Sequence, residues 1–300
     1  MLQVLTHDIL PVFSMLALGF ALGAAGKVSR DEAAAVNRVA FLVLQPALIF
    51  PLINELDWSE FRFDAIALYA ACQVILFSAT FLIARKLLCR EVIEAWLLAM
   101  ATVFVNTLLY IWPISFLIYG EAAALPVTGI VAWDSAVSFA FFIVTTDLLV
   151  NKGAAPVRSL RRIAGNPVLI AIALGALGNV LGIVTPEPLL TAMDFAGAGA
   201  APLTLFALGV ILASQSLKPT RVVFVVSALK LLAFPALVWA ALHLGDRPAD
   251  WNALLVLTAA GPSGAMAFAL ALLHGVRTDQ IAPVIIWTSA LSLLSLAWLA

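Results

Sequence analysis

The residues FVNTLLYIWP, Phe104 to Pro113, decide the fold, because they place an amide, a hydroxyl and a proline inside an apolar run. That run extends from about residue 95 to residue 119. A second apolar run, Trp251 to His274, is interrupted by GPSG at residues 261–264. Interrupted apolar segments in both halves of a chain indicate a binding site held at membrane depth between two structural repeats.

The composition indicates that the chain folds in lipid. Of its 300 residues, 64% are hydrophobic and 11% are charged, whereas roughly a quarter of the residues of a soluble domain are charged. The spacing of Cys72 and Cys89 predicts neither a disulfide nor a metal site. The chain has no basic run for nucleic acid and no hydrolase or phosphate-binding motif, so we expect no enzyme, no cofactor and no nucleic-acid partner.

Ten apolar segments are predicted to span the membrane as helices, since a span needs about 20 residues. The N-terminus has no basic region and no cleavage site, so it is interpreted as part of the first helix and not as a signal peptide. The segments are 8–27, 34–54, 64–86, 95–118, 123–149, 167–185, 190–213, 221–243, 251–273 and 279–299.

The basic residues alternate between the two sides of the membrane. Twelve of the 16 Lys and Arg residues lie in the odd-numbered connections, and the even-numbered ones hold only Arg62 and Arg247. Basic residues favour the cytoplasmic side. The pattern predicts both termini outside and the central linker, 151–166, in the cytoplasm of a cell with an inner membrane.

A shift of 156 positions aligns the two halves of the chain. LPVFSMLALGFALGAAGKV from Leu10 falls on NPVLIAIALGALGNVLGIV from Asn166. The same shift places Asn106 on Pro262. Because each repeat holds five helices, an odd number, the second must enter the membrane from the opposite side. The predicted fold is an all-α membrane protein of ten helices in two inverted repeats, 1–150 and 167–300, in which the broken helices 4 and 9 cross.

The two interruptions are predicted to form the substrate site. Unwound backbone in lipid survives only where it is buried in protein or faces water, and helix N-termini that face one cavity favour an anion such as a carboxylate. Proline removes a backbone donor, and glycine permits unusual backbone geometry. The alternative is that the prolines only kink packed helices. The candidate residues are Asn106, Thr107, Pro113, Gly261, Pro262, Ser263 and Gly264.

Ionisable residues in the middle of predicted spans are further candidates, because a charge in lipid is costly. Asp134 in helix 5 is expected to contact substrate or to exchange a proton, with Trp133 beside it in the binding set. Lys230 in helix 8 is expected to compensate a half-helix C-terminus or a carboxylate. The alternative for both is a structural buried ion pair.

The order and spacing of several motifs resemble the auxin efflux carrier family. They include the segment from Leu10, PALIF from Pro46, the Asn106-Thr107 pair with the following Pro113, NPV from Asn166, AAPLTLFALG from Ala200, ALKLL from Ala228 and Pro262. The resemblance covers the whole chain. It implies crossed broken helices 4 and 9, a scaffold of helices 1, 2, 6 and 7 that can form a homodimer, and an elevator-like motion of helices 3–5 and 8–10.

The resemblance also implies an organic anion as substrate, with Asn106 at the crossing. Departures from the family pattern are Val105 where a proline is usual, Ile111 and Trp112 where a glycine is usual, and Asp134 in place of an asparagine. A carboxylate at residue 134 would repel an anion unless it is protonated, so it can bring in a coupled proton. The alternatives are a sodium- or proton-coupled carrier of the same fold, like a bile-acid symporter, and a receptor that does not transport.

Overall fold

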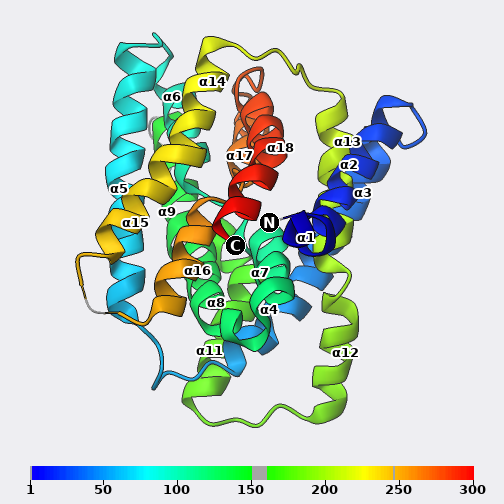
Figure 1. The fold of residues 1–300 in the computed structure, drawn as a ribbon. Coiled ribbons are helices and arrows are strands. Elements are labelled where there is room, and N and C mark those ends of the chain that lie inside the picture. The colour runs from blue at the N-terminus through cyan, green and yellow to red at the C-terminus, as the bar shows by residue number, and fades with distance from the viewer. Residues whose placement is uncertain (1, 151–160, 246) are drawn as a thin grey trace.

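The computed structural model describes residues 2–150, 161–245 and 247–300, and in these ranges the chain forms helices joined by short connections (Figure 1). The β-structure in the described chain is one isolated antiparallel bridge between Val105 and Ser263. The all-α prediction is therefore confirmed. Most of the linker predicted at 151–166, namely 151–160, lies outside the described residues.

The helices follow the apolar segments closely. In the first half they are α1 (Leu2–Val4), η1 (Leu5–Ile9), α2 (Leu10–Ala24), α3 (Arg30–Val39), η2 (Ala40–Leu44), α4 (Gln45–Asn54), α5 (Phe63–Lys86), α6 (Val92–Val103), η3 (Thr107–Ile111), α7 (Trp112–Tyr119), η4 (Gly120–Ala123), α8 (Ala124–Ala132), η5 (Trp133–Ser138) and α9 (Phe139–Val150). In the second half they are α11 (Pro167–Val180), α12 (Glu187–Gly197), α13 (Ala200–Ala213), α14 (Arg221–Ala228), η6 (Leu229–Ala233), α15 (Phe234–Leu242), α16 (Ala249–Ala259), α17 (Met266–Leu273) and α18 (Ile281–Leu299).

Seven helical stretches of the described chain are long and apolar enough to cross a membrane: Leu2–Ala24, Arg30–Asn54, Phe63–Lys86, Ala124–Val150, Glu187–Ala213, Arg221–Leu242 and Ile281–Leu299. The other three predicted segments contain only shorter helices. Segments 95–118 and 251–273 each contain a helix break, and segment 167–185 holds the 14-residue helix α11. Helix length alone therefore supports seven spans and not the predicted ten.

Prolines explain most of the irregular turns in these helices. The π-helical stretches η1, η2, η3 and η6 each end two residues before a proline, namely Pro11, Pro46, Pro113 and Pro235. The residue between stretch and proline donates its N–H five positions back, as Trp112 does to the Thr107 carbonyl. The wider turn leaves room for the proline ring, which clashes with the carbonyl four positions earlier in a regular helix. These prolines therefore lie within continuous helical stretches and do not interrupt them.

The helices form two groups; in Figure 1, α2, α3, α12 and α13 of one group lie on the right, and α5, α9 and α15 of the other lie on the left. The four-segment group comprises Leu2–Ala24, Arg30–Asn54, Pro167–Val180 and Glu187–Ala213, in which α2 packs on α13 and α4 packs on α11. Both pairs approach closely through glycine. A Cβ on Gly19 would overlap the Phe206 carbonyl oxygen, and one on Gly175 would lie 2.9 Å from the Phe50 carbonyl oxygen.

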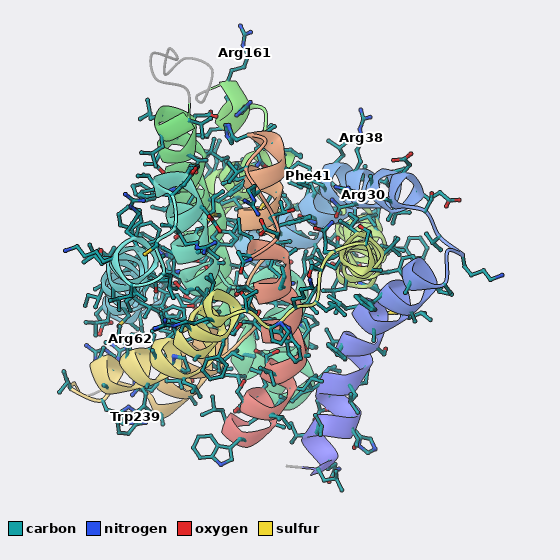
Figure 2. All side chains as sticks on the ribbon, turned by 90° about the horizontal axis from the view of Figure 1, so that it is seen from above. Arg30, Arg38, Phe41, Arg62, Arg161 and Trp239 are labelled. Carbon is teal, nitrogen blue, oxygen red and sulfur yellow. The ribbon has the colours of Figure 1, made fainter. Side chains whose placement is uncertain are left out.

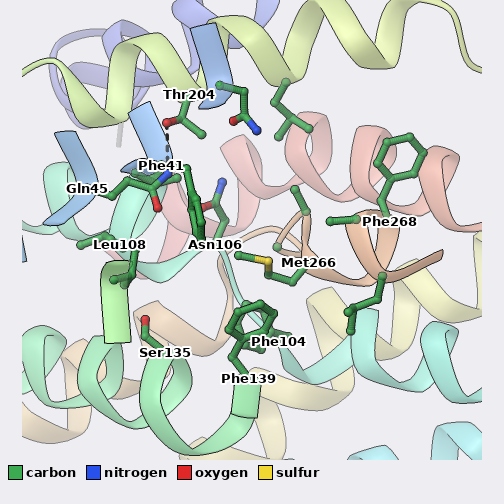
Figure 3. Close-up of a pocket in the computed structure, with 18 of the residues that line it drawn as sticks. Phe41, Gln45, Phe104, Asn106, Leu108, Ser135, Phe139, Thr204, Met266 and Phe268 are labelled. Carbon is green, nitrogen blue, oxygen red and sulfur yellow. Dashed lines mark hydrogen bonds between the residues drawn. The ribbon is translucent and has the colours of Figure 1, made fainter. Parts of the chain in front are cut away.

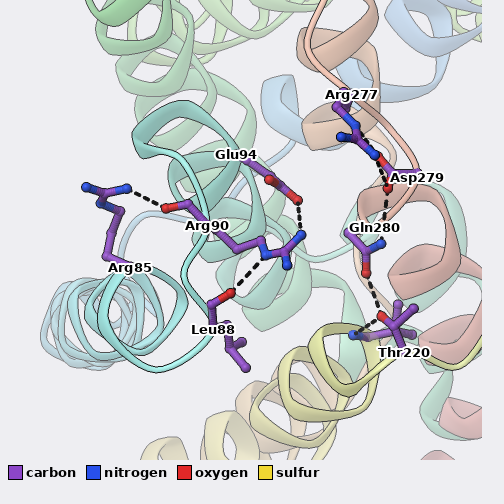
Figure 4. A network of polar contacts seen from close by, with 9 residues as sticks. Arg85, Leu88, Arg90, Glu94, Thr220, Arg277, Asp279 and Gln280 are labelled. Atoms are coloured by element: carbon purple, nitrogen blue, oxygen red, sulfur yellow. Dashed lines mark hydrogen bonds and ion pairs between the residues drawn. The ribbon is translucent and has the colours of Figure 1, made fainter.

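The six-segment group comprises α5, residues 92–119, α8 to α9, α14 to α15, residues 249–273 and α18, and it holds most of the large apolar core. Polar contacts gather at one end of this group, where its connections meet (Figure 4). Arg90 pairs with Glu94 at 3.5 Å, and the Thr220 hydroxyl donates to Gln280 at 2.5 Å. The first contact lies at the start of α6, and the second joins the N-terminal ends of α14 and α18.

Replacing Gly19 by alanine is expected to destabilise the fold. The added methyl group would overlap the Phe206 carbonyl oxygen and push α2 away from α13. Such overpacking costs about 1–3 kcal/mol, so thermal unfolding in detergent should occur at a lower temperature. Gly199→Ala is the control, because its nearest neighbour would lie at an ordinary 3.4 Å. Equal midpoints for the two variants would contradict the close packing of α2 on α13.

Candidate substrate site

Two non-helical segments meet inside the six-segment group. Helix α6 ends at Val103 and η3 begins at Thr107, while α16 ends at Ala259 and α17 begins at Met266. Val105 and Ser263 form the antiparallel bridge between the two segments. Both are buried, with 2% and 1% of their surface exposed. Residues 158 positions apart in the sequence are thus backbone neighbours in the core.

The meeting segments pair each other's backbone groups. Asn106 N donates to the Pro262 carbonyl at 3.1 Å, and Gly264 N donates to the Phe104 carbonyl at 2.8 Å. The Ser263 hydroxyl donates to the Ala101 carbonyl at 2.6 Å, and Ser263 N donates to the Thr288 hydroxyl at 3.1 Å. An unpaired backbone group in a nonpolar interior costs several kcal/mol. The bridge therefore stabilises two interruptions that neither segment could maintain alone.

The glycines of the GPSG segment allow this close approach. A Cβ on Gly264 would lie 2.9 Å from the Phe104 ring, and one on Gly261 would overlap the Ile111 side chain. Neither glycine has the positive φ that only glycine adopts readily. Space, and not backbone conformation, therefore explains why glycine occupies both positions.

Two helix N-termini begin where the segments separate. Tyr110 N and Ile111 N donate to the Asn106 carbonyl, so the N–H groups of residues 107–109 precede the first turn of their helix. In α17 the first such bond runs from Ala269 N to the Ala265 carbonyl. The first N–H groups of a helix have no partner within it and carry partial positive charge.

Both N-termini open into one cavity of about 560 Å³ between the two helix groups (Figure 3). The six-segment group contributes Asn106, Thr107, Leu108, Ser135 and Met266 among others. The facing wall comes from the four-segment group, with Phe41, Gln45, Thr204 and Leu208. Gln45 Nε2 donates to the Thr204 hydroxyl at 3.3 Å. The cavity combines apolar walls with a few fixed polar groups, as small-molecule sites do.

Asp134 lies at this cavity and is held by donors from three helical segments. Gln73 Nε2 donates to its Oδ1 at 2.8 Å, the Thr107 hydroxyl to its Oδ2 at 3.3 Å, and the Ser138 hydroxyl to Oδ1 at 3.4 Å. Trp133 Nε1 donates to Gln73 Oε1 at 2.7 Å and so orients that amide. The contact with Thr107 connects the carboxylate directly to the first residue after the break.

Lys230 lies behind the paired segments 104–106 and 260–264, which are called the crossing below, and its side chain is fully buried. Its Nζ donates to the Ala259 carbonyl at 2.7 Å and lies 4.8 Å from the centre of the Phe234 ring. Ala259 is the last residue of α16, where carbonyl groups lack helical partners and the helix dipole is negative. The Lys230 ammonium group therefore caps the last carbonyl group of α16.

Gln73 does the same for the first interruption, since its Nε2 also donates to the carbonyl of Val103 at 3.1 Å, the last residue of α6. The 156-position shift relates Val103 to Ala259. Each half-helix C-terminus is therefore capped by a buried side chain from the preceding span.

The structure brings together some of the predicted site residues and separates others. Asn106, Thr107, Asp134 and Gly264 line the cavity. Residues outside the lining are Trp133, Lys230, Gly261, Pro262 and Ser263, which lie in or behind the crossing, and Pro113.

Pro113 requires a correction to the expected position of the break. The non-helical residues are 104–106, and Pro113 lies in the first turn of α7, where proline is tolerated. It lines a separate apolar cavity of about 280 Å³ that also includes Pro11, Leu48 and Trp112. Pro113, which suggested the break in the sequence, thus lies seven residues after Asn106, the last non-helical residue of the break.

Sequence reasoning missed Gln73, Gln45 and Thr204. Gln73 and Gln45 each interrupt an apolar run, which is the signal that singled out Asp134, and both are buried. Thr204 carries no such signal because threonine is common in spans. Within the described chain no group of three or more His, Cys, Asp or Glu side chains could hold a metal ion.

Comparison with known proteins assigns the family. A family model described as Membrane transport protein matches residues 4–151 and 154–299, almost the whole chain. The chain belongs to the auxin efflux carrier family. It is therefore a membrane transport protein with several apolar helices, as the motif order predicted. No enzymatic activity is indicated by the family or its members.

Two relatives extend along nearly all of this carrier. One, from Rhizobium meliloti (strain 1021), is named "Putative malonate transporter" and is 29% identical over 300 residues, 96% of this chain and 92% of the relative. The other, from Methanothermobacter thermautotrophicus, is named "Uncharacterized transporter" and is 25% identical over 296 residues, 97% of this chain and 96% of the relative.

Proposed function

We propose that this chain is a secondary carrier that moves a small organic anion, a carboxylate, across the cytoplasmic membrane. The observation that carries the proposal is the shared cavity at the crossing. Asn106 and the N-termini that begin at Thr107 and Met266 all lie against it. Backbone N–H groups at helix N-termini bind carboxylates and phosphates without a counter-cation.

The name of the Rhizobium relative suggests a substrate to test first. A malonate-like dicarboxylate fits a cavity of about 560 Å³ easily. One carboxylate would accept from the Asn106 amide and the two N-termini. The second would face Gln45 and Thr204, which lie on the opposite wall (Figure 3).

Equivalent contacts in the two halves support ten spans in two inverted repeats. Gly19 meets Phe206 while Gly175 meets Phe50, and the 156-position shift exchanges one pair for the other. The caps on Val103 and Ala259 follow the same relation. In this arrangement residues 92–119 and 249–273 are the crossed, broken fourth and ninth spans.

The two helix groups fit the scaffold and moving parts of an elevator-type carrier. The cavity lies between them, so sliding one group past the other would carry the crossing, and any anion on it, across the membrane. Leu108 lines both the large cavity and the smaller apolar one. It would separate the open side from the closed side. Exposed apolar side chains of the scaffold, such as Phe195 on α12, would face lipid or a second copy.

The basic residues suggest which side is open. Arg30 and Arg161 belong to the odd-numbered connections, which hold most of the basic residues, and Arg62 belongs to an even-numbered one; Figure 2 shows these side chains from above. Arg30 and Arg162 line the cavity. Because basic residues favour the cytoplasm, the cavity would open inward, with both termini outside.

Asp134 and Lys230 are the residues that we propose for coupling and charge compensation. Both are buried in the six-segment group, and Asp134 contacts Thr107 at the substrate cavity. A proton on the carboxylate would remove its repulsion of an anionic substrate, so proton and anion would move together. A sodium-coupled carrier of the same fold is the second candidate, in which the carboxylate and the hydroxyls of Thr107 and Ser138 would hold the cation.

The substrate site is tested by Asn106→Ala in proteoliposomes with a panel of mono- and dicarboxylates that includes malonate. Loss of the amide removes a side-chain hydrogen bond of about 1–3 kcal/mol, so transport efficiency should fall about 5- to 150-fold. Asn252→Ala, which removes an amide on α16 away from both cavities, should retain the parent rate. Transport by Asn106→Ala at the rate of the parent protein would contradict a substrate site at the crossing.

Proton coupling is tested by Asp134→Asn, which keeps the shape of the side chain and removes its titration. The parent protein should respond to an imposed pH gradient, and the variant should transport at a rate that the gradient does not change. Uptake of the same anion is measured with and without the gradient at constant membrane potential. A parent protein indifferent to the gradient, or a variant that still responds, would refute a coupling role for Asp134.

A further inference from the structure

The mouth of the large cavity differs in charge from its inner end. The side chains that line it near the crossing include one ionisable group, Asp134, whereas Arg30 and Arg162 line it near the ends of α3 and α11. Lys230, the buried cation of the six-segment group, is outside the lining and is bonded to Ala259. An anion that enters therefore meets positive side chains first.

Arg30 is the arginine of the described cavity lining whose charge is not balanced by an ion pair. Among the described residues it has no hydrogen bond and no ion pair, and its side chain is exposed. Asp31 and Glu32 follow it in α3, but neither lines the cavity. The Glu32 carboxylate turns back and accepts from the N–H and the hydroxyl of Ser29, at 2.8 and 2.7 Å. The positive charge at residue 30 is thus directed at the cavity without a local partner.

Arg162 is different, because its charge is balanced. Its Nη1 donates to Asp147 Oδ1 at 2.7 Å, and the same oxygen lies 3.1 Å from His274 Nε2. Asp147 is buried at the end of α9 and His274 follows α17, so this contact joins a residue that precedes α11 to the six-segment group. Arg162 therefore forms part of the cavity wall and connects the two helix groups. Because its charge is paired, it adds less to the electrostatic potential in the cavity than Arg30 does.

We propose that Arg30 forms an outer recruiting site for small carboxylates at the mouth of the cavity, separate from the site at the crossing. The proposal rests on an anionic substrate and deepens the proposed function by adding an entrance step. A single uncompensated cation at the rim of a low-dielectric cavity raises the local anion concentration and the rate of association. The field acts at a distance, so the anion need not stay bound to the arginine.

The test measures the electrostatic field in the cavity and does not require transport. A cysteine replaces Ser135, which lines the cavity, in a Cys72→Ala/Cys89→Ser background. Its reaction rates with a sulfonate-bearing and with a neutral methanethiosulfonate of similar size are compared, in detergent-purified protein. The ratio of the two rates reports the local potential whatever the natural substrate is.

In Arg30→Gln the anionic-to-neutral rate ratio should fall about two- to five-fold at low salt, the size expected when one charge on the wall of a partly aqueous cavity is lost. The difference should disappear in 1 M salt, where the screening length is about 3 Å. Arg30→Lys, which keeps the charge, should retain the parent ratio. Arg38→Gln is the matched control, since Arg38 lies on the same helix outside the lining.

The results separate this proposal from the proposed function. An unchanged ratio in Arg30→Gln, or an equal fall in Arg38→Gln, would overturn the recruiting site even if the protein transports carboxylates. A salt-sensitive fall in Arg30→Gln alone would support it, even if the panel of anions identified no substrate. An unchanged rate with the neutral reagent verifies that the variant keeps its fold and an open cavity.

Discussion

The fold depends on the requirement that backbone N–H and C=O groups in a lipid-embedded protein find partners within the protein. Two interrupted helices violate this requirement separately. They satisfy it together, because residues 104–106 and 260–264 meet as an antiparallel pair with bonds from Asn106 to Pro262 and from Gly264 to Phe104. The interruption in each half of the chain is therefore stable only in the presence of the other.

At each break, the helix end before the break is capped by a side chain, and the helix start after it is not. The half-helix C-termini are capped from behind, by Gln73 at Val103 and by Lys230 at Ala259. The N-termini that begin at Thr107 and Met266 keep their first N–H groups at the cavity. Buried side chains thus neutralise the negative helix ends, and the positive ends remain available. This asymmetry makes the crossing suited to an anion.

Much of this architecture could be predicted from the sequence. The offset of 156 aligned Gly19 with Gly175 and Phe50 with Phe206, and these four residues make equivalent helix contacts. A lipid environment requires long apolar runs and makes polar residues within them unusual. Both features can therefore be recognised in a single sequence. The all-α class followed from them, and the membership of a transporter family followed from the order and spacing of motifs such as PALIF and AAPLTLFALG.

The position of the first break and the walls of the cavity could not be predicted as well. Pro113 suggested a break up to seven residues too far along, because a proline bends a helix through a π-helical turn as readily as it ends one. Gln45, Thr204 and Arg30 face the cavity through packing between distant segments, which residue type alone does not reveal. The sequence suggested that Gly261 is needed for an unusual backbone conformation. In the structure its φ is not positive, and glycine is needed there because a Cβ would overlap the Ile111 side chain.

The crossing itself is tested most directly by a disulfide between Val105→Cys and Ser263→Cys in a Cys72→Ala/Cys89→Ser background. Residues 105 and 263 form a non-hydrogen-bonded antiparallel pair, whose Cα atoms lie about 4.5 Å apart, within disulfide range. Oxidation with iodine followed by peptide mass spectrometry should give the 105–263 disulfide in high yield. The control pair Val105→Cys with Val184→Cys should give none. Absence of the 105–263 disulfide in folded, monodisperse protein would contradict the paired interruptions and the site built on them.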